Sequence, residues 1–202
     1  MKKALHVIGA ALLLAASLSG HQARAADAVT VGTVGSASAN LWPVFIGMRK
    51  GFFEAQNLKL DLVYVQSSAN LVQQLAAGSL DITMSTGLVD PIRAISQKAS
   101  LAIVRFEVHA PPYAISAKPG IKTLKELKGK VISLGGPKDI TKIYVERMLA
   151  PHGVKPGEFD MVFAGSTAAR SSALQAGAVD AAILLPPFNS FSVLMPGFAE
   201  IA

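Results

Sequence analysis

The hydrophobic and polar positions of the chain follow one arrangement that occurs twice. Residues 62–66 form a short β-branched and aromatic run, followed by small hydroxyl residues, a helical stretch, a glycine, an aspartate and another apolar run. The same order returns 99 residues later, from residue 161 onward. Each copy predicts a strand, a helix capped by a serine, and a second strand. Two such α/β units suggest two lobes that hold something small between them.

The rest of the chain alternates in the same way between strand-like and helix-like segments. Strands are predicted over residues 29–34, 58–65, 81–84, 101–108, 130–134 and 181–185. Helices are predicted over residues 41–50, 67–77, 91–97, 124–128 and 140–149. This alternation indicates an α/β fold of βαβ units with mainly parallel sheets flanked by helices. The expected organisation is a first lobe over 26–112, a hinge crossing over 113–120 and a second lobe over 121–202.

The first 25 residues have the pattern of a secretory signal peptide. Lys2 and Lys3 precede a mostly apolar stretch over residues 4–18, and Ala23-Arg24-Ala25 forms a small-x-small cleavage site. The apolar stretch is short for a membrane span. We therefore expect cleavage before Ala26; the alternative is an uncleaved N-terminal anchor.

Charge and composition narrow the classes of function. Without the three basic residues of the predicted signal peptide, the net charge falls from +6 to +3. The remaining basic residues are dispersed and do not interleave with aromatic residues, so we expect no nucleic-acid partner. The chain has no cysteine, which excludes disulfides and the usual lipoprotein anchor. We expect a soluble mature protein.

Small polar residues gather where the predicted strands end. Ligands of open α/β sheets bind outside the carboxyl ends of the strands, and hydroxyl and backbone N–H groups at helix N-termini suit an anion or a polar head group. The alternative for each hydroxyl residue is a simple helix cap. The candidate ligand-binding residues are Ser36, Ser38, Asn40, Trp42, Ser67, Ser68, Ser85, Thr86, Tyr113, Gly136, Lys138, Ser166 and Thr167.

Four of the larger residues near these loops have two interpretations each. Trp42 and Tyr113 are either packing residues or cover an apolar face of the ligand. Lys138 and Arg170 are the cations at predicted ligand-side loops or first helical turns. Each is either a contact for an anion or a solvated surface charge, and Lys138 is the preferred contact for an anion.

Enzymatic chemistry has little support in the sequence. His109 and His152, the histidines beyond the signal peptide, lie in predicted loops, and no G-x-S-x-G or nucleotide-binding motif is present. Asp81 and Asp180 stand at equivalent positions of the repeat and are interpreted as turn residues. We expect no catalytic residue, no metal site and no cofactor.

Three segments carry the most specific motifs. Ile121–Val131 reads I-K-T-x-x-x-L-K-G-K-V, Leu75–Gly87 contains L-x-x-G-x-x-D followed by S-T-G, and Ala173–Ala182 contains A-x-x-x-G-x-V-D-A. These motifs resemble those of periplasmic substrate-binding proteins of ABC importers of the sulfonate/nitrate/taurine type. The resemblance covers residues 29–194 and implies a type II periplasmic-binding fold with two lobes, a hinge and a ligand cleft.

The resemblance also implies a function. A member of this family traps a small polar or anionic organic solute, such as a sulfonate, nitrate or taurine, by hinge closure in the periplasm. It then delivers the solute to the permease of an ABC transporter at the inner membrane, and we expect a monomer. The family's second-lobe loop is commonly serine-rich, whereas Pro137-Lys138-Asp139 stands here, which argues against a simple sulfonate site.

Family members continue beyond the point at which this chain ends and return to the first lobe through a second hinge. The resemblance therefore implies a C-terminally truncated chain that lacks this return. Three alternatives remain open: a secreted α/β enzyme that uses the same cleft, a relative of pyrimidine-precursor synthases, and a non-functional truncation product.

Overall fold

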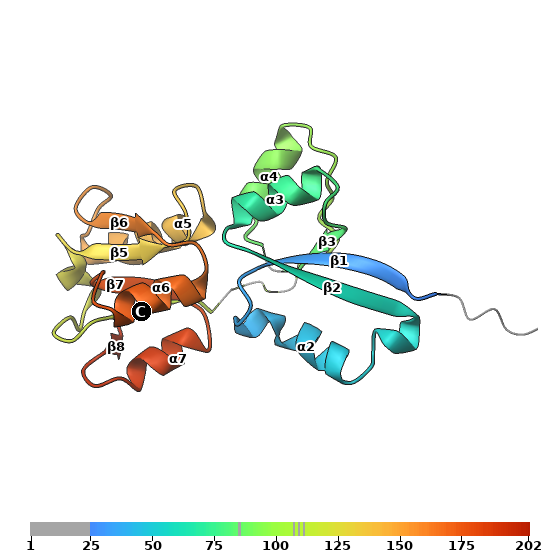
Figure 1. Ribbon diagram of the computed structural model, residues 1–202. Coiled ribbons are helices and arrows are strands. Elements are labelled where there is room, and N and C mark those ends of the chain that lie inside the picture. The colour runs from blue at the N-terminus through green and yellow to red at the C-terminus, as the bar shows by residue number, and fades with distance from the viewer. Residues whose placement is uncertain (1–24, 85, 107, 109, 111) are drawn as a thin grey trace, which may run out of the picture.

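The computed structural model describes residues 25–202 except residues 85, 107, 109 and 111. The predicted signal peptide up to residue 24, Ser85 and His109 therefore lie outside the described residues. The described chain forms two α/β lobes, each built on its own sheet (Figure 1). This is the α/β fold with flanking helices that the alternation of strands and helices predicts.

The first lobe contains a three-stranded parallel sheet in the order β2-β1-β3. One side of the sheet carries α2, and α3 and α4 lie on the other (Figure 1). The strands are β1 (Asp27–Val34), β2 (Leu58–Val65) and β3 (Ile82–Thr83), the helices are α2 (Trp42–Arg49), α3 (Ser68–Ala76) and α4 (Val89–Ser96), and η1 (Ala39–Leu41) and η2 (Glu54–Gln56) are short 3₁₀ helices.

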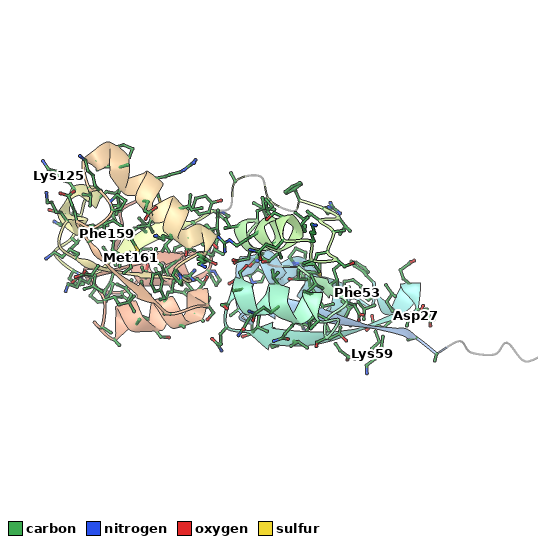
Figure 2. The ribbon with its side chains drawn as sticks, turned by 90° about the horizontal axis from the view of Figure 1, so that it is seen from above. Asp27, Phe53, Lys59, Lys125, Phe159 and Met161 are labelled. Atoms are coloured by element: carbon green, nitrogen blue, oxygen red, sulfur yellow. The ribbon has the colours of Figure 1, made fainter. Side chains whose placement is uncertain are left out.

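The second lobe contains a five-stranded mixed sheet in the order β6-β5-β7-β4-β8. Strands β5, β6 and β7 are parallel, while β4 runs antiparallel to both β7 and β8. Helix α5 covers one face, and α6 and α7 cover the other (Figures 1 and 2). The elements are β4 (Ala114–Ala117), η3 (Leu124–Leu127), β5 (Val131–Leu134), α5 (Ile140–Leu149), η4 (Ala150–His152), β6 (Asp160–Phe163), α6 (Thr167–Gln175), β7 (Ala181–Leu184), α7 (Phe188–Val193) and β8 (Ala199–Glu200).

The two copies of the repeat fold alike. The hydroxyl of Ser67 accepts a hydrogen bond from the Asn70 N–H (3.2 Å), and that of Ser166 accepts one from the Ala169 N–H (3.3 Å), so both serines are N-caps. Both helices end at a glycine with positive φ, 73° at Gly78 and 72° at Gly177. The left-handed conformation at these positions favours glycine because an L side chain would be strained.

The aspartates of the repeat do more than turn the chain. Asp81 Oδ2 accepts the backbone N–H of Thr30 on β1 (2.7 Å), and the Asp81 N–H donates back to the Thr30 carbonyl (3.0 Å). Asp180 pairs with Val131 at the start of β5 in the same two ways, at 2.7 and 2.8 Å. Each aspartate thus fixes the start of one strand against the next.

The central part of the chain differs from the expected arrangement in two places. The described residues between 101 and 108 form no strand, so the strand expected there is wrong. Val104 and Phe106 are 80% and 58% exposed, and no described strand pairs with this segment. Residues 114–117, expected within the hinge crossing, form the fully buried strand β4 of the second sheet. The passage between the sheets therefore lies between α4 and β4.

Most of the hydrophobic core lies in the second lobe. Ile115, Leu127, Ile132, Leu149 and Ile183 are completely buried there. The first-lobe cluster consists of Val65, Leu71 and Leu80 with three partly buried neighbours. No helix among the described residues has both the length and the apolar character needed to span a membrane.

Candidate functional site

The carboxyl ends of strands in both lobes face the other lobe. Asp27 and Lys59, at the amino ends of β1 and β2, lie at the outer end of the first lobe (Figure 2). Phe159, just before β6, lies in the outer part of the second lobe (Figure 2). The loops that follow β1, β2 and β6 are consequently brought together between the lobes, as expected for open α/β sheets.

A cavity lies between these loops. Its empty volume is about 460 Å³, including space open to solvent. Both lobes contribute to the wall, which combines small residues, hydroxyl groups, apolar side chains and two charged side chains. The lining residues are Val34, Ser38, Ser67, Ser68, Gly87, Tyr113, Gly135, Asp139, Ile140, Gly165, Thr167, Arg170 and Leu185.

The lobes touch beside this cavity through the two equivalent loops of the repeat. A Cβ atom built on Gly165 would overlap the carbonyl oxygen of Gln66, its counterpart in the first copy. One on Gly35 would lie 3.2 Å from the Ser166 Cβ. A backbone hydrogen bond from the Ala39 N–H to the Pro186 carbonyl (2.8 Å) also joins the lobes. The structure therefore shows the lobes in contact around the cavity.

Arg170 is the central charged group of the site. It lies in the first turn of α6 and is only 3% exposed. Its Nε donates to the Ile183 carbonyl (2.7 Å), Nη1 to the Gly165 carbonyl, and Nη2 to the hydroxyl of Thr167 (2.8 Å). A guanidinium carries five N–H donors, so these three bonds leave two for another acceptor.

No ion pair among the described residues includes Arg170. Burial lowers the pKa of its guanidinium, while Tyr113 and Asp139 act in the opposite direction. Arginine is nevertheless protonated at neutral pH. A buried cation without a paired carboxylate is costly, and an anion in the cavity would compensate this charge.

Tyr113 and Asp139 lie near Arg170 on the same wall. Burial raises the pKa of the Tyr113 hydroxyl to about 12, which keeps it protonated and able to donate a hydrogen bond. Its ring packs against Tyr144 with centroids 5.4 Å apart. Asp139 is the N-cap of α5, and its Oδ1 accepts hydrogen bonds from the N–H (2.8 Å) and the hydroxyl (2.6 Å) of Thr141.

Hydroxyl groups of the first lobe form the opposite side of the site. Ser68 is 4% exposed, and its hydroxyl shares a hydrogen bond of 2.6 Å with that of Thr86. Ser67 caps α3, and Ser38 is 6% exposed. Ser67 therefore both caps a helix and lines the cavity. A hydroxyl residue can thus be a helix cap and a candidate ligand contact at the same time.

The structure brings five of the thirteen candidate residues to the cavity wall: Ser38, Ser67, Ser68, Tyr113 and Thr167. Ser36 and Lys138 are exposed, and Trp42 is 51% exposed. Asn40, Thr86, Gly136 and Ser166 are at least partly buried but do not line the cavity. Ser85 lies outside the described residues. A role of Lys138 in binding remains a prediction.

Arg170 was named as a possible contact for an anion, but it was not among the thirteen candidate residues. Its interpretation as a solvated surface charge is wrong, because the side chain is buried. The repeat contains the signal that identifies it: with Ser166 aligned on Ser67, Arg170 falls on Leu71, which is completely buried. Asp139, Gly135 and Gly165 were also not among the candidates.

The described residues contain no group of three or more histidine, cysteine, aspartate or glutamate side chains that could hold a metal ion. What the arrangement offers is hydrogen-bond donors, one buried cation and one carboxylate around a small space. Such a set suits the binding of a small polar molecule.

Several solved structures with a similar fold are described as solute-binding proteins. The alkanesulfonate-binding protein SsuA from Xanthomonas axonopodis pv. citri, bound to MOPS, superposes with a TM-score of 0.70 at 22% identity, covering 87% of this chain and 60% of that chain. The periplasmic aliphatic sulfonate-binding protein SsuA from Escherichia coli gives 0.65 at 23% identity, with the same coverage.

The periplasmic nitrate-binding protein NrtA from Synechocystis PCC 6803 gives a TM-score of 0.68 at 15% identity, covering 86% of this chain and 50% of that chain. The present chain thus spans between half and about 60% of the length of these proteins. At these identities the similarity shows the fold, which is that of type II periplasmic-binding proteins.

A comparison with proteins of curated function finds no match. Residues 38–192, more than half of the chain, match the family described as NMT1/THI5 like. The matched range includes both copies of the repeat and the whole lining of the cavity except Val34. The chain therefore belongs to the NMT1/THI5-like family.

Proposed function

We propose that the protein is a periplasmic receptor that binds a small anionic or polar organic solute and delivers it to the permease of an ABC importer. Family membership and the fold shared with sulfonate- and nitrate-binding proteins support this proposal. The predicted signal peptide agrees with export. The proposal assigns no catalytic residue to the chain.

The observation that carries the proposal is the buried guanidinium of Arg170 at a cavity between two lobes. Two of its five N–H groups are free of the bonds that hold it in place. A planar fork of donors matches the oxygen atoms of a sulfonate, carboxylate, phosphonate or nitrate. We assign Arg170 as the anion anchor of the receptor.

The remaining contacts come from both lobes. The Tyr113 and Thr167 hydroxyls lie on the second-lobe side, and Ser38, Ser67 and Ser68 contribute from the first. A solute that contacts both sides favours the state in which the lobes are together, so binding and closure are coupled. A permease can then recognise the loaded receptor if the open and closed states present different surfaces.

The test is a thermal-shift and calorimetric screen of the purified protein with ethanesulfonate, nitrate, methylphosphonate and short carboxylates. A bound solute raises the melting temperature by mass action. Arg170→Met is expected to weaken binding of any hit by 10- to 100-fold, since a charge-assisted hydrogen bond is worth about 1.5–3 kcal/mol.

Arg147→Met is the matched control. Arg147 lies on α5, is exposed, and does not line the cavity, so the variant removes the same charge without touching the site. It is expected to bind as the wild type does. Equal affinity of wild type and Arg170→Met would remove Arg170 from the site, and no response to any acid would contradict a receptor for anionic solutes.

A further inference from the structure

The first lobe contains a strand-like segment without a partner. Residues 101–106 have the sequence LAIVRF and follow α4, yet they form no strand, and no described strand pairs with them. Their β-branched and aromatic residues favour a strand. The free side of β3 is also unpaired, because β3 is an edge of its sheet and β1 is its neighbour among the described strands. Such an edge is a place where another chain can add a strand.

The second lobe shows what occupies the equivalent place. The repeat aligns β1, β2 and β3 with β5, β6 and β7, and the next helix is α4 in the first lobe and α7 in the second. Residues 97–100 join α4 to residues 101–106, and residues 194–198 join α7 to β8, so residues 101–106 correspond to β8. In the second sheet β4 lies between β7 and β8 and runs antiparallel to both. The described part of the first lobe has no strand in the position that corresponds to β4.

Exposed apolar side chains come from the elements around this position. In the second lobe α7 packs against β4 and β8, and the Ser192 hydroxyl donates to that of Ser116 on β4 (2.7 Å). The equivalent elements of the first lobe expose seven large apolar residues: Ile82, Leu88, Ile92, Ile95, Ile103, Val104 and Phe106. With a full surface on the order of 200 Å² each, their exposed parts amount to roughly 700 Å² per copy, close to the ~800 Å² that each partner buries in a stable interface.

A second copy of the chain fits this position by symmetry. Strand β8 is parallel to β7, since both run antiparallel to β4, and the correspondence gives residues 101–106 the same direction as β3. A two-fold axis perpendicular to the sheet pairs the two copies of this segment antiparallel. The segment of one copy then lies beside β3 of the other and antiparallel to it, as β4 does to β7. The resulting order is β2, β1, β3, the partner's segment, the copy's own segment, and the partner's β3, β1 and β2.

We infer that the chain forms a two-fold symmetric dimer in which residues 101–106 of each copy complete the first-lobe sheet of the other. The dimer gives each segment two neighbouring strands and covers the seven exposed apolar residues. None of these seven lines the cavity between the lobes, so the paired surface and the candidate solute site are separate. The dimer does not depend on the proposed receptor function, and it differs from the monomer expected from the sequence.

Sedimentation equilibrium of the purified protein tests for the dimer. Val104→Asp places a charge in the paired apolar surface and is expected to raise the dissociation constant of the dimer at least tenfold. Leu194→Asp is the matched control, because Leu194 is 79% exposed, Val104 is 80% exposed, and Leu194 lies after α7 in the second lobe. A wild type that stays monomeric at about 0.1 mM would overturn the inference, since interfaces of standard size bind in the micromolar range or more tightly.

A cysteine scan locates the paired segment. The chain has no cysteine, so a single cysteine placed at each of positions 101–106 forms a protein disulfide only with a second copy. In an antiparallel pair around a two-fold axis, one position or two adjacent positions meet their own copies, and a disulfide requires Cα atoms about 4.4–6.8 Å apart. Cross-linking under mild oxidation is expected to peak at one or two neighbouring positions. Leu194→Cys should cross-link at least tenfold less.

The remaining outcomes distinguish between possible occupants. A dimer that shows uniform or no cross-linking over residues 101–106 would have its interface elsewhere, and the inference would be wrong. A monomer in which the amides of residues 101–106 are protected against hydrogen exchange would mean that another segment of the same chain fills the position, which would also overturn it. Equal dissociation constants of wild type and Val104→Asp would exclude this segment from the interface.

Discussion

At the scale of single residues, Gly165 determines how closely the lobes approach. Its φ is 72°, and a Cβ atom would overlap the carbonyl oxygen of Gln66 in the other lobe. Gly165→Ala is therefore expected to hold the lobes apart and to weaken solute binding by tenfold or more, the equivalent of at least about 1.4 kcal/mol. Calorimetry gives the affinity, and small-angle scattering should show a larger radius of gyration with solute present.

Gly177 provides a close control for this prediction. It has the same φ of 72°, but a Cβ atom there would meet nothing within 4 Å. Both variants place an alanine in the left-handed conformation, which lowers the free energy of unfolding by about 1–2 kcal/mol. Only Gly165→Ala should change affinity and dimensions. If the two variants bind solute equally well, contact between Gly165 and Gln66 has no part in closure.

Much of the site could be predicted from the sequence, and its charged part could not. The hydroxyl residues that line the cavity were found because caps at strand ends are local features: Ser67 and Ser68 follow β2 directly, and Thr167 follows the cap of α6. Arg170 was named as a possible contact for an anion, but Lys138 was preferred, because the burial of a polar helix position depends on what packs over it, here the backbone around Ile183 and Gly165. The aligned Leu71 is the one sequence signal for that burial.

At the scale of elements, the two aspartates of the repeat fix neighbouring strands with unequal strength. The Asp180 side chain is 15% exposed and also pairs with Lys118, whereas Asp81 is an exposed residue. Asp180→Ala is therefore expected to lower the free energy of unfolding by about 1–3 kcal/mol, and Asp81→Ala by less than about 1 kcal/mol, since water can replace its bond to Thr30. Urea unfolding of both variants measures the difference.

The pH dependence of this stabilisation follows from the pKa of Asp180. Burial alone would raise this pKa, but the bonds from Lys118 and from the Val131 N–H outweigh burial and hold it below its usual value. A lowered pKa stabilises the native state fully above the ordinary pKa of aspartate, about 3.9, and the effect is lost as the pH falls through the native pKa. The stability difference between wild type and Asp180→Ala should therefore shrink below about pH 4. A difference that grows in acid would contradict this assignment.

The predicted helices and strands agree with the structure where their sequence signals are local. The range of α5 was predicted and is confirmed, and the helix expected over residues 124–128 is present as the 3₁₀ helix η3. The strand expected over 101–108 is wrong. A strand needs a neighbouring strand to pair with, and a β-rich composition does not show whether one is present. Strand β4 was not predicted as such, since an antiparallel partner such as β7 far along the chain leaves no local pattern.

At the scale of the whole molecule, apolar burial is unevenly divided between the lobes. The second lobe contains two clusters of buried hydrophobic residues, and the first lobe one small cluster. Large apolar side chains of the first lobe remain exposed, among them Trp42 at 51%, Ile46 at 55%, Phe52 at 62% and Ile92 at 53%. Since burial of apolar surface is the main favourable term in folding, the first lobe should open more readily.

Hydrogen exchange followed by mass spectrometry tests this division. Amides of β2 and α3 are expected to exchange at least tenfold faster than those of β5 and β7, because segments with few buried contacts open with lower free energy than the core. A bound solute should slow exchange most in the loops around Ser67 and Arg170, which face each other across the cavity, and less in the outer half of either lobe. Equal exchange in both lobes would show that they unfold as one cooperative unit. In that case the contacts between Gly165 and Gln66 and between Ala39 and Pro186 would have to transmit the stability of the second core to the first lobe even without solute.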